Sequence, residues 1–273
     1  MQLKEELVNL KRRDYAVSED YDYMRTAVKM LENIGTVDDE LRDELIYFTF
    51  SHWILQDCFS GSELRQLLNW VCDDRHMFYK IGESHTDSVF TRSFSVLLIP
   101  LLLLADEARP YLTPVEVNGI KDSLIRFLRF ERDYRGYMEG KGWAHSIAHA
   151  ADAVGEISKR NLAQDDLIAL LEAIRGAVCI KDRVYTNMED DRLTTAVIMI
   201  LEHEELDPVL ISNWLNSFTL WEKSEQSYKK HKIISNVKNF LAALYFRLST
   251  KGSLPELAQA VKQVRQEIMK PYT

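Results

Sequence analysis

The chain has 273 residues, of which 46% are hydrophobic and 28% charged, a composition typical of a folded globular protein and not of a disordered one. Its 10 glycines and 6 prolines are about half the usual share, which argues against a many-turned β-sandwich or barrel and favours long helices. The net charge of −8 excludes the basic surface that general nucleic-acid or anionic-membrane binding requires. We therefore expect neither a nucleic acid nor a membrane as partner.

Cysteine usage and the apolar segments indicate a cytoplasmic protein. The cysteines are far apart, without CxxC spacing, and we expect them to be reduced: Cys58, Cys72 and Cys179. Residues 1–13 form a charged amphipathic segment that lacks the apolar centre of a signal peptide. The apolar stretch Val96–Ala105 contains Pro100 and is about half as long as a membrane span, so we predict a buried helix there.

Helix starts are visible along the whole chain. Capping boxes or a cap followed by proline occur at four places: Ser60–Glu63, Thr113–Glu116, Asp207–Pro208 and Ser253–Glu256. Apolar residues recur at helical spacing within 167–178 and within 237–248. No run shows the strict alternation of a strand. The sequence therefore predicts an all-α protein of about a dozen helices.

A basic or imidazole residue recurs every 46 to 53 residues, each time near the start of a predicted helix that then turns apolar: Arg42, Arg92, His145, Arg192 and Lys238. A period of this length with two helices per unit is typical of HEAT and armadillo repeats, which form a right-handed α-α superhelix. The alternative architecture is an α/α toroid, a closed ring of helix pairs. In a superhelix, the polar segments 81–93, 131–152 and 185–192 would share one edge.

The middle polar segment carries a pattern that suits metal binding. His145, His149 and Asp152 stand at i, i+4 and i+7, so they project from one helix face. Two imidazoles at this spacing can reach one divalent ion, with Asp152 as a third ligand. A fourth ligand would come from Glu189, Asp190 or Asp87. The alternative is structural, with His145 bonded to a loop carbonyl and His149 a satisfied core histidine.

Arginines near the helix starts have two interpretations. They form either a ladder of buried ion pairs that ties adjacent repeats together, with Arg192 as a member, or a binding site for an anionic small molecule. The candidate ligand-binding residues are Asp87, Arg92, Arg135 and Arg192. Three glycines ahead of Trp143 indicate a tight crossing or a place where a ligand meets backbone, and we expect Trp143 to be a packing wedge.

Acidic pairs leave room for glycosidase chemistry. Glu131 with Asp133, and Glu189 with Asp190, could supply the acid and the base. This hypothesis belongs to the toroid architecture.

The strings DSVFTRSFS, ERDYRGY, KGWAHSIAHAAD and EDDR resemble a bacterial family of domains of unknown function, numbered 2785, from about Asp73 to Phe246. Ala150 stands where the pattern leads us to expect glycine. The resemblance implies a helical bacterial protein and no particular activity. It divides the chain into N-terminal helices (1–75), a family-like core (76–246) and a C-terminal capping helix (247–273). The polar residues that match the family are Asp87, Arg92, Glu131, Asp133, Arg135, Gly136, His145, His149, Asp152, Glu189, Asp190 and Arg192.

The sequence supports three hypotheses. The leading one is a cytoplasmic helical-repeat protein whose clustered His, Asp, Glu and Arg edge binds a small ligand or a divalent metal, with catalysis left open. The second is a protein-interaction scaffold in which the cluster is structural and a protein is the partner. The third is a glycoside-processing α/α toroid.

Overall fold

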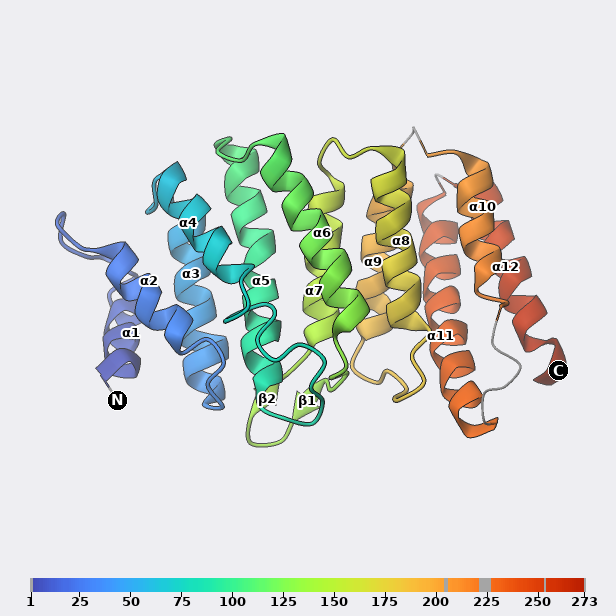
Figure 1. Ribbon diagram of the computed structural model, residues 1–273, viewed down its shortest axis with the longest axis horizontal. Helices are drawn as coiled ribbons and strands as arrows, with labels where there is room; N and C mark the ends of the chain where they lie inside the picture. The colour runs from blue at the N-terminus through green and yellow to red at the C-terminus, as the bar shows by residue number, and fades with distance from the viewer. Residues whose placement is uncertain (1, 204–205, 221–226, 253, 273) are drawn as a thin grey trace.

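The computed structural model describes residues 2–203, 206–220, 227–252 and 254–272 (Figure 1). Within these ranges the chain is mostly helical, so the predicted all-α class is confirmed. The elements in chain order are α1 (Gln2–Arg12), α2 (Tyr23–Glu32), the π-helix η1 (Glu40–Ile46), α3 (Tyr47–Leu55), α4 (Gly61–Val71), α5 (Ser88–Ala108), α6 (Pro114–Phe130), β1 (Tyr137–Met138), β2 (Gly142–Trp143), α7 (Ser146–Ser158), α8 (Gln164–Val178), α9 (Glu189–Leu201), α10 (Pro208–Ser217), α11 (Ser227–Lys251), α12 (Pro255–Met269) and the 3-10 turn η2 (Lys270–Tyr272).

The helices form two layers. The odd-helix layer consists of α3, α5, α7, α9 and α11, each packed against the next. The even-numbered helices α4, α6 and α8 pack on α5, α7 and α9, and α6, α8 and α10 contact one another in sequence. The row is open, with the two termini at opposite ends of the longest axis (Figure 1). The molecule therefore differs from the closed ring that a toroid requires.

Helix starts agree with the predicted caps wherever the structure describes them. Ser60 and Thr113 each close a full capping box with the glutamate three residues on, at the starts of α4 and α6. Asp207 caps α10 ahead of Pro208. The fourth predicted cap includes Ser253, which lies outside the described residues.

The apolar stretch Val96–Ala105 lies inside α5, as predicted, and is mostly buried. By length and composition α5 is, among the described helices, the one candidate for crossing a membrane. However, 78% of its most apolar window is buried inside the protein. Its burial is that of a core helix, because α3, α4 and α7 all pack against it.

A short hairpin between α6 and α7 is the one place among the described residues where strands form. Tyr137 pairs with Trp143 and Met138 with Gly142, so β1 and β2 are antiparallel. The sequence patterns predicted no strand, because two-residue strands are too short to show alternation. The tight crossing that the glycines indicated is confirmed: a Cβ on Gly142 would lie 2.9 Å from Nη2 of Arg42.

Arg42 anchors this hairpin from η1. Its fully buried guanidinium donates to the carbonyls of Thr36 and Lys141, each at 2.6 Å, and its Nη2 lies 2.8 Å from Asp43. The same group lies 4.2 Å from the ring centre of Phe90. Such contacts compensate part of the cost of burying the charge. The hairpin is therefore held against the N-terminal helices.

We predict that Gly142→Ala destabilises the protein by about 3 kcal/mol and Gly140→Ala by about 1 kcal/mol. Both glycines have φ of +73°, so both variants carry the strain of a left-handed residue, but a Cβ at Gly140 meets no atom within 4 Å. Urea unfolding of the two variants measures the difference, and equal losses would show that contact with Arg42 is unimportant.

Candidate functional site

The polar segments lie side by side, as predicted. Nη2 of Arg135 donates to the carbonyl of Thr86 at 2.6 Å, which joins the first segment to the second. Nε2 of His145 lies 3.0 Å from the carbonyl oxygen of Asn187, which joins the second to the third. The three segments therefore form one continuous polar edge at the N-terminal ends of α5, α7 and α9.

Arg92 is fully enclosed and is a member of an ion-pair ladder. Its Nε and Nη2 donate to the two carboxylate oxygens of Glu131 at 2.7 and 2.9 Å, and both side chains are completely buried. The remaining donors reach the hydroxyl of Ser88 and the carbonyls of Tyr79, Lys80 and Glu83. Because every donor is used inside the protein, Arg92 offers nothing to an anionic ligand.

Asp133 and Arg135 form a second, largely buried pair in the same loop. Nε and Nη2 of Arg135 donate to the two carboxylate oxygens of Asp133 at 2.7 and 2.6 Å, and the backbone N–H of His85 also donates to this carboxylate, at 2.9 Å. Asp87 lies apart from them, exposed and paired with Lys141 at 2.7 Å. The predicted ligand-binding set is thus divided among separate pairs.

The predicted face of α7 exists, and it is the least buried face of that helix. We call His145, His149, Asp152 and Glu156 the α7 stripe: His145, Asp152 and Glu156 are half-buried, whereas His149 and the other α7 residues are buried between α5, α6 and α9. The i, i+4, i+7 spacing therefore predicted the shared face correctly.

His149 is held by Ser93 of α5. The Ser93 hydroxyl donates its one hydrogen to the carbonyl of Ala144, so Nδ1 of His149 must donate to the Ser93 oxygen, 2.8 Å away. This assigns the Nδ1–H tautomer and leaves Nε2 as an acceptor. Nε2 has no partner among the described residues and is not among the fully enclosed unpaired atoms. Burial, with a smaller effect from His145, lowers the pKa of His149 to about 3.

His145 begins α7 and is fixed on both sides. Its ring stacks on Trp143 with centroids 4.3 Å apart, and its Nε2 contacts the Asn187 carbonyl, with the Glu189 carboxylate 3.8 Å away. Burial lowers the pKa of His145 and Glu189 opposes that shift. Trp143 is 39% exposed, so it is a stacking platform for His145 and not the expected packing wedge.

Asp152 and Arg192 connect α7 to α9 by an ion pair. The Arg192 side chain is 49% exposed, so the expectation of a buried arginine is wrong here. Arg192 lies on the open face of α9, whereas Arg92 is covered by two loops. The charges of both groups affect the pKa of Tyr47 in α3. Burial and Asp152 raise this pKa, and Arg192 opposes the rise.

The geometry gives no support for a metal centre. Among the described residues, no group of three or more His, Cys, Asp or Glu side chains is placed to hold a metal ion. Nε2 of His145 is directed to the Asn187 carbonyl, and the two imidazole rings meet edge to face at 5.9 Å. Glu189 instead accepts the backbone N–H of Asn187 at 2.8 Å. Asp190 is half-buried, and burial raises its pKa.

The Glu131–Asp133 pair proposed for glycosidase chemistry is engaged in ion pairs with arginines. Glu131 and Asp133 are buried and neutralised by Arg92 and Arg135. Their oxygens also accept backbone N–H groups within the loop. These interactions favour a structural role for the pair.

No sequence pattern pointed to Tyr47 or Ser93. Both reach the α7 stripe from other helices: Ser93 lies in the family-like string DSVFTRSFS but was not singled out within it, and Tyr47 precedes the family-like core. Only tertiary packing brings them to His149 and Asp152.

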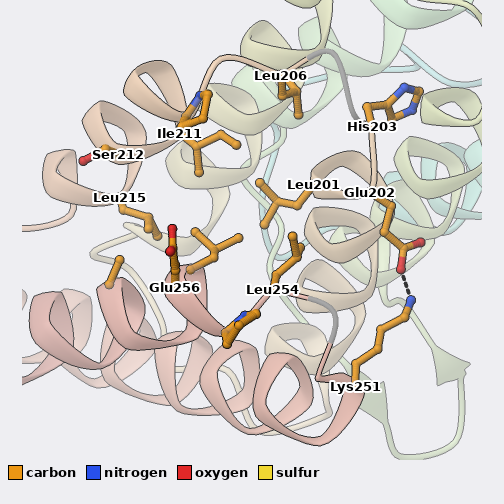
Figure 2. Close-up of a pocket in the computed structure, with 14 residues that line it drawn as sticks. Leu201, Glu202, His203, Leu206, Ile211, Ser212, Leu215, Lys251, Leu254 and Glu256 are labelled. Carbon is orange, nitrogen blue, oxygen red and sulfur yellow. Dashed lines mark ion pairs between the residues drawn. The ribbon is translucent and has the colours of Figure 1, made fainter.

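A mostly apolar cavity lies away from this cluster. A pocket of about 780 Å³ opens between the end of α9, α10 and the start of α12, and its lining is mostly apolar. Figure 2 shows Leu201, Leu215 and Leu254 directed toward the same space, with the Glu202–Lys251 ion pair at one side. None of the predicted site residues lines it.

A family model described as "Protein of unknown function (DUF2785)" matches residues 77–246. The chain belongs to the DUF2785 family. The resemblance stated from the sequence is thereby confirmed. No curated protein and no solved structure matches the chain. All the predicted site residues, from Asp87 to Arg192, lie within the DUF2785 region, and so does Ser93, whereas Tyr47 lies before it.

We predict that Arg92→Met destabilises the protein by about 4 kcal/mol, because it leaves the Glu131 carboxylate buried and unpaired. The double variant Arg92→Met/Glu131→Gln should recover much of the loss, since no buried charge remains. Arg192→Met is the matched control and should cost less than about 1 kcal/mol, because that pair is partly exposed. Urea unfolding at pH 7 gives all three values; equal losses at Arg92 and Arg192 would contradict the assignment.

The lowered pKa of His149 predicts a pH-dependent stability. His149 has its ordinary pKa of 6.5 in the unfolded chain, so it is protonated there below pH 6.5. In the folded protein it stays neutral down to about pH 3. Stability attributable to this residue is therefore complete above pH 6.5 and is lost as the pH falls, by about 2 kcal/mol at pH 5. Unfolding free energies at pH 7 and pH 5 should differ less in His149→Phe than in the wild type. An identical pH dependence would show that His149 is not buried in the neutral form.

Proposed function

We propose that the protein is a right-handed α-α superhelix of the HEAT or armadillo type that binds a small molecule on its odd-helix layer. The two-layer arrangement and the open ends support this architecture. So do the residues that recur about every fifty positions: Arg92, His145 and Arg192 lie at the starts of α5, α7 and α9. Lys238 fits less well, because it lies in the middle of α11.

The ligand would bind at the α7 stripe. The observation that carries this proposal is Nε2 of His149, an acceptor on a side chain more than nine-tenths buried that has no partner in the described protein. Because Nε2 is not fully enclosed, a molecule that reaches it from the solvent side can donate a hydrogen bond to it. The neighbouring polar groups are Tyr47, His145 and the Asp152–Arg192 pair.

The tautomer and the pairing define the ligand class. A neutral imidazole that presents Nε2 accepts a hydrogen bond, so the ligand offers a hydroxyl or an amide N–H. Asp152 is paired with Arg192 and Glu156 with Lys159, so the stripe carries no unbalanced charge to attract an ion. We therefore propose a small uncharged polar molecule, bound without a metal. The free cysteines agree with the cytoplasmic location that we also propose.

The scaffold hypothesis is the competing function, and the charge pairs favour it. Arg92 with Glu131 and Arg192 with Asp152 each join two structural elements, as repeat-linking contacts would. In that case the stripe is structural and binds no small molecule.

We predict that His149→Phe lowers the affinity for such a ligand at least tenfold while the protein stays folded, because the phenyl ring replaces the packing but not the acceptor. The probes are neutral pentoses, hexoses, nucleosides and carboxamides, screened by saturation-transfer NMR against the full chain. His231→Phe, at an exposed position on α11, is the matched control. Binding should not change between pH 6 and 8, since His149 stays neutral there.

Two outcomes would count against this function. Binding that His149→Phe leaves intact would place the ligand elsewhere. A complete absence of binding, together with strong destabilisation by His149→Phe, would favour the scaffold.

A further inference from the structure

A second concave site lies on the polar edge, outside the α7 stripe. It is a pocket of about 330 Å³, which we call the loop pocket, and it is lined by Gly82, Ser84, His85, residues 132–135 and residues 182–183. The same interval of fifty residues separates Gly82 from Arg132 and Arg132 from Asp182. The three loops that come after α4, α6 and α8 thus meet at one place.

Arginines dominate this pocket. Arg132, Arg135 and Arg183 line it, against two acidic residues, Asp133 and Asp182. The loop pocket is therefore a positive spot on a chain whose net charge is −8. His85 also lines it and would add positive charge when protonated.

One of the acidic groups is already satisfied. The Asp133 carboxylate is 1% exposed, receives both donors of the Arg135 fork and accepts the backbone N–H of His85. Its role is to fix Arg135 against the pocket wall, which leaves Nη1 of Arg135 without an acceptor among the described residues. Asp182 is the one lining carboxylate that would repel an anion.

The other two arginines keep free donors. The side chain of Arg183 forms no hydrogen bond or ion pair with any described residue. Nη1 of Arg132 donates to the carbonyls of Arg129 and Glu131 at 2.9 and 2.7 Å. Arg132 also interacts with the Tyr134 hydroxyl. Burial raises the pKa of Tyr134, and Arg132 opposes this rise.

These contacts hold Nη1 of Arg132 in place, and the residue as a whole is exposed and lines the pocket. Guanidinium forks match the paired oxygens of phosphate and carboxylate groups. Arg132 and Arg183 can therefore share one anion between them.

We propose that the loop pocket binds a small, doubly charged anion, a phosphate monoester or a dicarboxylate, through Arg132 and Arg183, with Arg135 as a fixed wall. A pocket of this volume is at the lower end of the range for ligand sites, which suits a molecule of this size. The anion-binding set predicted from the sequence, Arg92 with Arg135 and Arg192, is thereby replaced: Arg135 stays, and Arg132 and Arg183 take the other positions.

Thermal unfolding of the full chain tests this proposal, with inorganic phosphate and malonate as probes from 0.1 to 20 mM at constant ionic strength set by sodium chloride. We expect the melting temperature to rise saturably with phosphate, malonate or both, and which of the two acts distinguishes the sources of the anionic group. Arg132→Gln and Arg183→Gln should each raise the half-saturating concentration at least fivefold. Arg25→Gln, an exposed arginine on α2, should change nothing.

The result that would overturn the proposal is a melting temperature that responds to neither anion, or a response that both pocket variants retain. Circular dichroism of the variants checks that they are folded; because both arginines lie at the surface end of their loops, each variant should have a native spectrum. His149→Phe should keep the full phosphate response, so that failure of the α7-stripe function and failure of this proposal are separate results.

Discussion

The polar edge depends on one buried ion pair, Arg92 with Glu131. Arg92 binds the carbonyls of the loop that precedes α5, and Oε1 of Glu131 accepts the backbone N–H groups of Arg132 and Asp133 at 2.8 Å. The pair therefore fixes two loops at once. A buried pair of this kind need not add net stability, but removing either partner is costly, so the two loops cannot rearrange independently.

The fixed loop in turn positions the start of α7. The carbonyl of Asp133 accepts the Ser146 hydroxyl at 2.6 Å, and the carbonyl of Arg135 accepts the backbone N–H of His145 at 3.0 Å. These bonds set the orientation of the α7 stripe. The arrangement of the α7 stripe thus depends on the Arg92–Glu131 ion pair, which is itself completely buried.

The sequence predicted those features that depend on local spacing. The capping boxes at Ser60 and Thr113 and the shared face of His145, His149 and Asp152 are all set within two turns of one helix. The sequence did not predict features that depend on how the elements pack over one another. Arg92 and Arg192 occupy similar places near helix starts, yet one is enclosed by two loops and the other lies on an open face. Tyr47 and Arg42 reach the polar edge from α3 and η1, which precede the DUF2785 region.

The two polar sites differ in the kind of group that they offer, and burial is the reason. At the α7 stripe burial keeps His149 neutral, because the free-energy cost of desolvating an imidazolium exceeds the stabilisation that the neighbouring groups provide. The neutral ring remains as a hydrogen-bond acceptor. Arginine cannot escape a charge by losing its proton, so at the loop pocket the charge persists and must be kept near the surface or paired. Asp133 pairs Arg135 there, and Arg132 and Arg183 stay accessible. Arg135 belongs to both sites, since its guanidinium lines the pocket while its carbonyl holds His145. Because Asp133 holds Arg135, one buried carboxylate helps to position both the wall of the loop pocket and the start of α7.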